Sequence, residues 1–185
     1  MHFTSVELNA RSSRAPIAEF VILVASYNNE KYCEANLASL AFQESSKPYR
    51  IIIVNDCSTD KTGELLEQFV DNHQLQSKVT LIHNTIRRYS LENIYWAIHN
   101  HIEDHKIVVS VDGDDQLSSN KVLLRLEQEY KNPHIHLTYG SYDSSTGSGT
   151  HYASRMPNNI IRKGLVRQLR TFKASHLKTF RAGLF

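Results

Sequence analysis

Short runs of β-branched residues alternate with longer segments of helical periodicity from Phe20 onward, and no other feature of the sequence constrains the fold as much. Consecutive parallel strands need crossover connections, which are usually helices. The alternation therefore predicts an α/β fold with a mostly parallel, Rossmann-like sheet flanked by helices. The expected strands are Phe20 to Ala25, Arg50 to Val54, Lys78 to His83, Lys106 to Val111 and Ile135 to Tyr139.

One of the helices expected between these strands is the segment SLENIYWAIHNHI. Ser90 has a side chain that is common at helix N-caps. Apolar residues then recur at helical spacing, so the helix is expected to turn one face toward the sheet. The side chains expected on that face are Leu91, Ile94, Tyr95, Ile98 and Ile102.

Length, charge and hydropathy limit the class of protein. With 185 residues, of which 41% are hydrophobic, the chain is long enough for one globular domain with a sizeable core. Its net charge of +2 at pH 7 gives no reason to expect nucleic-acid binding. No apolar run is long enough to cross a bilayer, so no transmembrane segment is expected, whereas peripheral membrane contact stays open.

The cysteine pattern bears on the cellular compartment. Cys33 and Cys57 have the spacing of neither a metal knuckle nor a disulfide framework. Reduced thiols are the rule inside cells, so the expected location is cytoplasmic.

Polar side chains follow the predicted strands at the points where the strands end. Ligands of parallel sheets collect at these carboxyl ends. Tyr27 follows the first strand, Asp56 the second, and Arg87 and Arg88 the third. An aromatic ring, a lone carboxylate and two guanidinium groups at one edge suit a base, a ribose and a diphosphate.

The fourth strand leads into the sequence VDGDD, which crowds Asp112, Asp114 and Asp115 together. Like charges at such spacing repel, and a bound cation relieves the repulsion. Oxygen ligands in a short turn favour Mn²⁺ or Mg²⁺. The acidic turn is therefore a candidate metal site.

Three motifs, VILVASYNNEKY, IIIVNDCSTDKT and VVSVDGDDQL, occur in this order. Together they resemble the nucleotide-binding half of the family 2 nucleotide-sugar glycosyltransferases, which have the GT-A fold. The resemblance covers roughly Phe20 to Gly140. It implies a metal-dependent, inverting glycosyltransferase that moves a sugar from a nucleoside diphosphate donor, with UDP as the expected nucleotide, to a glycan or lipid-linked acceptor.

The resemblance also implies roles for single residues on the nucleotide side of the site. Ala25 and Tyr27 would line the pocket of the base. Asp56 would accept the N–H of a uracil. Arg88 would approach the base or the phosphates.

On the metal side, the resemblance makes Asp112 and Asp114 the Asp-x-Asp pair. Asp112 would lie toward the ribose, and Asp114 would bind the ion that bridges the diphosphate. Asp115 would tune the site as a neighbour. Mn²⁺ or Mg²⁺ is the implied cofactor.

Two departures from the family pattern stand out. Where the family commonly has Asp-Asp-Gly-Ser, this chain has NDCS, so Cys57 occupies a position that often takes glycine. A positive φ there would strain a residue with a side chain. Downstream of Asp115, the only acidic residues are Glu127, Glu129 and Asp143, and none is a convincing general base. The catalytic residues thus stay unknown.

The resemblance divides the chain into an N-terminal extension (1–19), a nucleotide-sugar-binding half (20–140) and the start of an acceptor-binding half (141–185). The last part is expected to be incomplete. Its ending, HLKTFRAGLF, resembles a His-Leu-Arg-Thr-Phe stretch in the acceptor half of some family members.

Two other functions stay open. A sugar-phosphate nucleotidyltransferase uses a related α/β fold and carboxylate-bound Mg²⁺, although it usually has a glycine-rich signature near the first strand, and VASYNNEKY contains no glycine. A non-catalytic nucleotide-sugar-binding module would explain the missing base. Sugar, acceptor and oligomeric state do not follow from the sequence.

Overall fold

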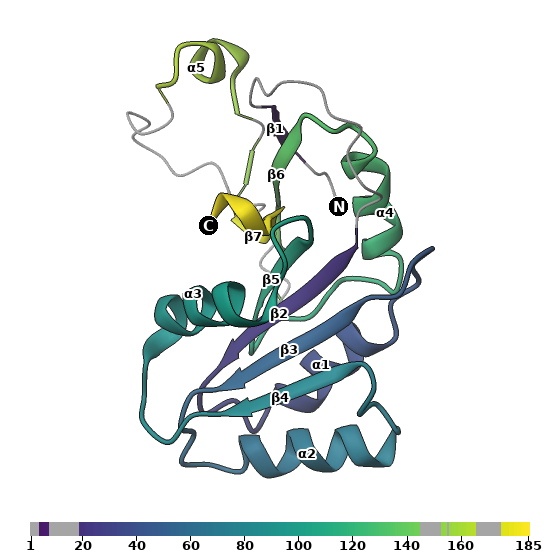
Figure 1. Ribbon diagram of the computed structural model, residues 1–185, viewed down its shortest axis with the longest axis vertical. Coiled ribbons are helices and arrows are strands. Elements are labelled where there is room, and N and C mark those ends of the chain that lie inside the picture. The colour runs from purple at the N-terminus through teal and green to yellow at the C-terminus, as the bar shows by residue number, and fades with distance from the viewer. Residues whose placement is uncertain (1–3, 8–18, 145–152, 155, 166–174) are drawn as a thin grey trace.

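The computed structural model describes residues 4–7, 19–144, 153–154, 156–165 and 175–185. Within them, seven strands form one sheet in the order β1-β6-β7-β5-β2-β3-β4 (Figure 1). The parallel strands are β2 (Phe20–Ser26), β3 (Arg50–Asn55), β4 (Val79–His83) and β5 (Ile107–Asp112). The strands that pair antiparallel are β1 (Thr4–Glu7), β6 (Ile135–Gly140) and β7 (Ser175–Arg181).

The predicted sheet, mostly parallel and flanked by helices, is confirmed, and the five predicted strands lie close to their expected bounds. Their β-branched runs are buried on both faces, as the exposed fraction of 0% for Ile22, Ile52 and Val109 shows. β7 is an additional strand between β5 and β6. Its buried residues alternate with more exposed ones, but several are polar, so the apolar signal of a strand is weak there.

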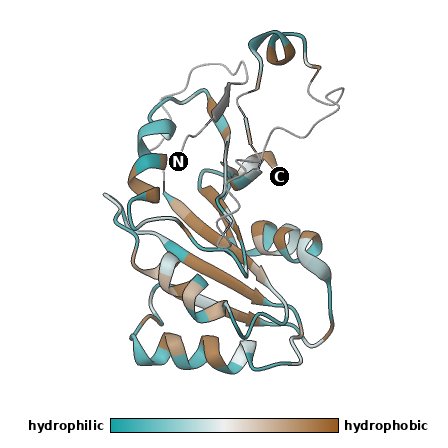
Figure 2. Cartoon of the chain, turned by 180° about the vertical axis from the view of Figure 1, so that it is seen from behind, coloured by the Kyte–Doolittle hydropathy of each residue, from teal (hydrophilic) through white to brown (hydrophobic). Residues whose placement is uncertain are grey.

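Helices cover both faces of the sheet. On one face pack α1 (Cys33–Ala41), α2 (Thr62–Asn72) and α4 (Val122–Tyr130). On the other face lie α3 (Tyr89–His101) and the short 3₁₀ helix η2 (Ala182–Leu184). The hydrophobic strands form the layer between them (Figure 2). The one-turn helix α5 (Asn158–Arg162) lies apart from the sheet at the top of Figure 1.

The prediction of which α3 residues face the sheet is wrong in part. Leu91 and Tyr95 have exposed fractions of 72% and 53%, so they point away from the sheet. The buried residues of the helix are Asn93, Ala97 and Ile98. The small Ala97 lets the helix approach the strands, and the amide oxygen of Asn93 accepts a hydrogen bond from Asn84 at 2.8 Å. A buried polar contact, which hydrophobic periodicity does not register, sets the rotation of the helix.

A buried hydroxyl network holds β7 in the sheet. Thr179 Oγ1 lies 2.8 Å from the hydroxyl of Tyr130 and 2.6 Å from Oγ1 of Thr138. Burial raises the pKa of Tyr130 to about 12. Because α4, β6 and β7 each contribute one hydroxyl, the network fixes the segment that carries His176.

None of the helices in the described ranges is long and apolar enough to cross a membrane. The boundary predicted near residue 141 falls between β6 and residues 145–152, which lie outside the described part of the chain. Because β7 belongs to the same sheet as β2, the division into two functional halves stays a prediction.

Candidate functional site

The acidic turn begins at Asp112, the last residue of β5, where it faces Ala25 across the ladder. The Asp115 backbone N–H closes the turn by donating to the Asp112 carbonyl at 3.1 Å. Asn36 of α1, which is buried, donates its side-chain amide to the carbonyls of Asp112 at 3.0 Å and Asp115 at 2.6 Å. The backbone of the turn is therefore held by a helix from elsewhere in the chain.

Close packing also explains the glycine within the turn. A Cβ atom on Gly113 would lie 2.4 Å from Asn29 Nδ2 and 2.8 Å from Ser26 Oγ. A side chain at this position would therefore have to displace the side chains of Asn29 and Ser26. Glycine keeps the acidic turn against the loop that carries Tyr27.

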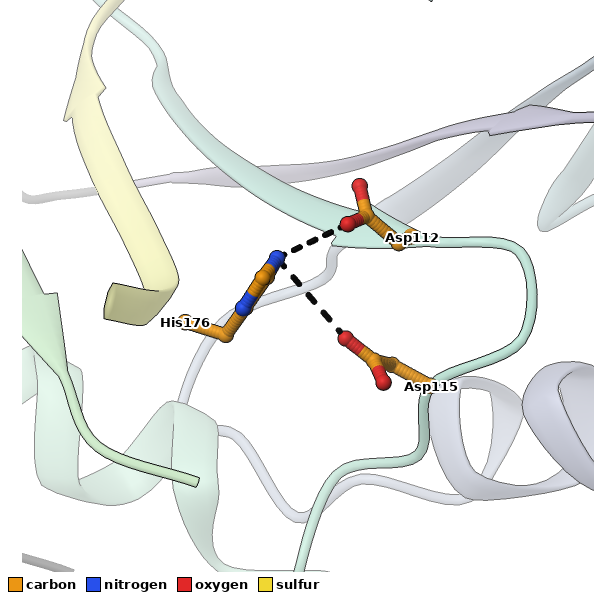
Figure 3. A group of neighbouring side chains, drawn as sticks. All are labelled: Asp112, Asp115 and His176. Atoms are coloured by element: carbon orange, nitrogen blue, oxygen red, sulfur yellow. Dashed lines mark hydrogen bonds and ion pairs between the residues drawn. The ribbon is translucent and has the colours of Figure 1, made fainter. Parts of the chain in front are cut away.

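His176 of β7 reaches the acidic turn from a distant part of the sequence. Its Nε2 atom lies 2.7 Å from Asp112 Oδ2 and 3.9 Å from Asp115 Oδ2. Figure 3 shows both carboxylates turned toward the imidazole. One ligand atom from each of the three residues lies within 4.8 Å of the others, which makes this group a candidate metal site among the described residues.

Negative charge is concentrated around Asp112, Asp115 and His176. Burial is the main cause that raises the pKa of Asp115, and the neighbouring charges of Asp112 and Asp114 raise it further. His176 acts in the opposite direction. A divalent cation among these side chains would relieve the repulsion. Two carboxylate oxygens and one imidazole nitrogen form a donor set that suits such an ion.

Asp114, which the resemblance places on the metal, is exposed on the same turn. It is not a member of the group formed by Asp112, Asp115 and His176. Its role as a ligand stays a prediction, as does the contact of Asp112 with a ribose. Sequence reasoning did not include His176 in the site. The HLKTF stretch was the available signal, but it indicated the acceptor half and not the metal.

Asp56 follows β3 and lies almost completely buried, with an exposed fraction of 3%. Its Oδ1 accepts hydrogen bonds from Asn84 Nδ2 and from the Arg88 backbone N–H, both at 2.8 Å. Its Oδ2 accepts one from the Tyr89 backbone N–H at 2.8 Å. Burial acts to raise the pKa of Asp56, but hydrogen bonds from Asn93, Arg88, Asn84 and Tyr89 together lower it. The group is thus a carboxylate that holds the start of α3.

The rim above Asp56 is aromatic and cationic. The guanidinium carbon of Arg87 lies 3.5 Å from the centre of the Tyr27 ring and 4.8 Å from that of Tyr89. The side chain of Arg88 instead pairs with Glu92 at 3.0 Å. Of the two arginines, Arg87 is therefore the one at the predicted base pocket, and the part assigned to Arg88 stays a prediction.

Hydrogen bonds between loops fix the position of Tyr27. The Asn28 backbone N–H donates to Ser58 Oγ at 3.0 Å, and the Thr59 backbone N–H donates to Asn28 Oδ1 at 2.9 Å. Between Asp56 and Ser58, Cys57 has a φ of 60°. The turn therefore needs the positive φ that the family's glycine suggested, and a cysteine adopts it here.

The three acidic residues beyond the turn differ in their surroundings. The carboxylate of Glu127 accepts hydrogen bonds from the side chains of Ser45 and Ser46 at 2.9 and 2.8 Å. Glu129 forms an ion pair with Arg125. Both glutamates therefore have structural partners. Asp143 lies on the surface after β6.

Comparisons with solved structures agree on the fold. The model superposes on TarS 1–349 of S. aureus in complex with UDP with a TM-score of 0.64 and 21% identity, covering 90% of this chain and 47% of that one. It superposes on the mannosyltransferase PcManGT from Pyrobaculum calidifontis, in complex with GDP-Man and Mn²⁺, with a TM-score of 0.59 and 17% identity, covering 88% and 44%. At these identities the likeness establishes the GT-A fold.

The sequence comparisons identify the family. Over 63 residues the chain is 38% identical to the poly(ribitol-phosphate) beta-N-acetylglucosaminyltransferase TarS of Staphylococcus aureus. The aligned stretch makes up 34% of this chain and 11% of the relative. The chain thus spans much less than the full length of its relatives. The family model of glycosyl transferase family 2 matches residues 21–185, which include all of β3 to β7, all of β2 except Phe20, and both carboxylates that meet His176. This chain therefore belongs to glycosyl transferase family 2.

Proposed function

We propose that this chain provides the donor-binding site of a metal-dependent, inverting glycosyltransferase. The enzyme would move a sugar from a UDP-sugar to a glycan or lipid-linked acceptor. The observation that carries the proposal is the meeting of three groups at one edge of the parallel sheet. Tyr27 follows β2, the buried Asp56 follows β3 and the acidic turn follows β5. Ligands of parallel sheets bind at such an edge.

The hydrogen bonds of Asp56 support uracil as the base. A carboxylate offers about four acceptor positions. Asn84, Arg88 and Tyr89 occupy three of them, and the Asn93 amide approaches the same carboxyl closely enough to lower its pKa. Uracil presents a single N–H, which would compete with Asn93 for one position, whereas guanine presents two adjacent donors and would need a second acceptor.

The acidic turn supports the metal. Asp114 is the ligand assigned by the family pattern, and Asp112 lies beside it at the end of β5. When bound, the ion supplies positive charge to the departing diphosphate. Ala25, opposite Asp112, and Tyr27 would line the pocket of the base. Arg87 and Arg88 would add positive charge on the side of the phosphates.

The proton of the acceptor hydroxyl needs a base in an inverting reaction. Glu127 and Glu129 are engaged by Ser45, Ser46 and Arg125. We therefore expect this chain to bind donor well and to transfer sugar slowly. Acceptor-dependent turnover that disappears in Asp143→Asn would instead identify Asp143 as the base.

Calorimetric titration with UDP tests the proposal directly. Binding should require Mn²⁺ or Mg²⁺ and should lose its metal dependence in Asp114→Ala. Asp104→Ala is the matched control, because Asp104 is exposed just before β5, at the opposite end of the strand from the turn. Equal UDP binding with and without metal would contradict the metal assignment. Turnover of a nucleoside triphosphate and a sugar phosphate, with release of pyrophosphate, would favour a nucleotidyltransferase.

A cytoplasmic location is part of the same proposal. Cys33 and Cys57 are both free thiols, which fits a reducing compartment and the cytoplasmic pool of nucleotide-sugars. Fractionation of the cells that produce the protein would test this assignment.

A further inference from the structure

We propose that the acceptor carries a phosphate next to the hydroxyl that receives the sugar, and that Lys178 of β7, together with Ser110 of β5, binds this phosphate. The inference rests on the proposed function, because it places the donor sugar at the acidic turn. It adds a substrate class and two binding residues.

Positive charge is concentrated in the last part of the sequence. Residues 144–185 contain eight Lys or Arg residues and no Asp or Glu, so they carry a charge of +8. The whole chain carries +2, so residues 1–143 carry −6. Such a separation of charge favours an anionic ligand for the basic part of the chain.

The order of the strands places Lys178 on the acceptor side of the donor site. The groups proposed to bind the nucleotide follow β2, β3 and β4, and the acidic turn follows β5. In the sheet, β5 lies between β2 and β7, so β7 is on the side of the acidic turn away from the nucleotide groups (Figure 1). An acceptor must approach the donor sugar from outside the nucleotide pocket, and β7 borders that side.

The register of the strands puts Lys178 on the same face of the sheet as Asp112. Ser110 and Asp112 are two positions apart in β5, so their side chains leave the same face about 7 Å apart along the strand. Lys178 pairs with Ser110 in the antiparallel ladder of β5 and β7, and side chains of paired residues leave the same face. Lys178 and Ser110 thus lie one step along β5 from the carboxylate at the donor site.

This face of β5 opens toward the acidic turn. Val108 is completely buried in a cluster with Ala97 of α3. Ser110, the next residue on the face, is half-buried, and Asp112 is exposed. Lys178 is exposed as well. Helix α3 therefore covers the far end of the face and leaves the end near the turn open to a ligand.

Lysine and serine together suit a phosphate. The ammonium group offers three N–H donors and a full positive charge, and the hydroxyl offers one further donor. Cβ atoms of paired residues on neighbouring strands are about 4.5–5.5 Å apart, so both side chains can donate to one phosphate. Ser110 is the one polar residue of β5 before Asp112, in a strand that otherwise consists of Val and Ile. The pair supplies charge and hydrogen bonds at a position that packing alone would leave apolar.

Calorimetric titrations with two phosphate-bearing probes and their neutral counterparts test the inference. A glycerol trimer joined by phosphodiesters is compared with triglycerol, and hexyl diphosphate glucose is compared with hexyl glucoside. At least one phosphate probe should bind more tightly than its neutral counterpart, and the probe that does so distinguishes a phosphodiester-linked from a lipid-linked acceptor. Lys178→Gln should weaken the binding of that probe by about 10- to 100-fold, the usual loss for a hydrogen bond to a charged group.

Three further variants sharpen the test. Lys178→Arg keeps the charge and should retain most of the affinity for the phosphate probe. Ser110→Ala removes a neutral donor and should weaken binding by about 2- to 10-fold. Lys121→Gln is the matched control, because Lys121 is exposed before α4 on the opposite face of the sheet, and it should behave like the wild type. Equal affinity for phosphate and neutral probes, or a preference for phosphate that survives in Lys178→Gln, would overturn the proposal.

UDP titrations of the same variants separate this inference from the proposed function. Lys178→Gln should change the affinity for UDP much less than the affinity for the phosphate probe. A loss as large for UDP would assign Lys178 to the donor diphosphate and overturn the inference. If the wild type binds UDP but does not prefer phosphate probes, the inference fails and the function stands. If it binds a phosphate probe through Lys178 and does not bind UDP, the anion site stands and the function fails.

Discussion

Asp56 Oδ2 accepts the backbone N–H of Tyr89 at 2.8 Å, at the residue where the chain takes a φ of 64° to begin α3. A left-handed backbone costs about 1–2 kcal/mol for a residue with a side chain. The neighbouring N–H of Arg88 donates to the same carboxylate. Asp56 thus stabilises a strained helix start.

Asp56→Asn should destabilise the fold. Asparagine keeps one acceptor oxygen but places an amide against N–H groups of Arg88 or Tyr89, and an unsatisfied buried donor costs about 1–3 kcal/mol. Urea denaturation at pH 7 should show a loss of this size. Asp104→Asn, at an exposed carboxylate, should change the free energy of unfolding by less than about 0.5 kcal/mol. Equal stability of the two variants would argue against the capping role of Asp56.

The comparison of wild type with Asp56→Asn also gives a prediction about pH. The folded pKa of Asp56 is lowered from the ordinary value of 3.8, so its ionised form stabilises the fold above about pH 4. This contribution is lost as the pH falls through the folded pKa, where the wild-type carboxyl becomes protonated and resembles an amide. The difference in unfolding free energy between wild type and Asp56→Asn should therefore be largest at neutral pH and shrink toward pH 3. A difference that is constant from pH 7 to pH 3 would contradict it.

Cys57→Gly should stabilise the protein. Cys57 has a φ of 60°, so glycine would remove about 1–2 kcal/mol of backbone strain while adding about 0.5–1 kcal/mol of conformational entropy loss on folding. The expected net gain is about 0.5–1 kcal/mol, measurable by thermal or urea unfolding. Cys57→Ala keeps the strain and should show no gain. Stabilisation by alanine as large as by glycine would point to the thiol and not to φ.

Much of the fold could be predicted because the central strands β2, β3 and β5 contain runs of aliphatic residues, with Ile51, Ile52 and Ile53 all buried. Such runs have few alternatives to a sheet covered on both faces. The positive φ at Cys57 was predictable for a different reason. The family commonly has glycine at this position, and glycine takes a positive φ most readily.

Other parts depend on contacts that leave no local pattern. Asn93 rotates α3 through a buried hydrogen bond to Asn84, so Leu91 and Tyr95 face outward despite their helical spacing. His176 meets Asp112 across 64 residues of sequence, through a strand whose buried positions include Ser175 and Thr179. Hydrophobic periodicity detects neither contact, because both depend on polar side chains that the tertiary fold brings together.

The last prediction separates the two arginines after β4. Arg87 covers the Tyr27 ring at 3.5 Å, where a stacked base would lie, while Arg88 is paired with Glu92. A bound base must displace Arg87, and the freed guanidinium can then reach a phosphate. Arg87→Ala should therefore weaken UDP binding by about tenfold or more, the usual loss for a hydrogen bond to a charged group, without weakening the binding of uridine. Arg88→Ala should have a smaller effect on UDP. Calorimetric titrations of both variants with UDP and with uridine test this assignment, and a larger loss for Arg88→Ala would restore the contact that the family pattern suggested.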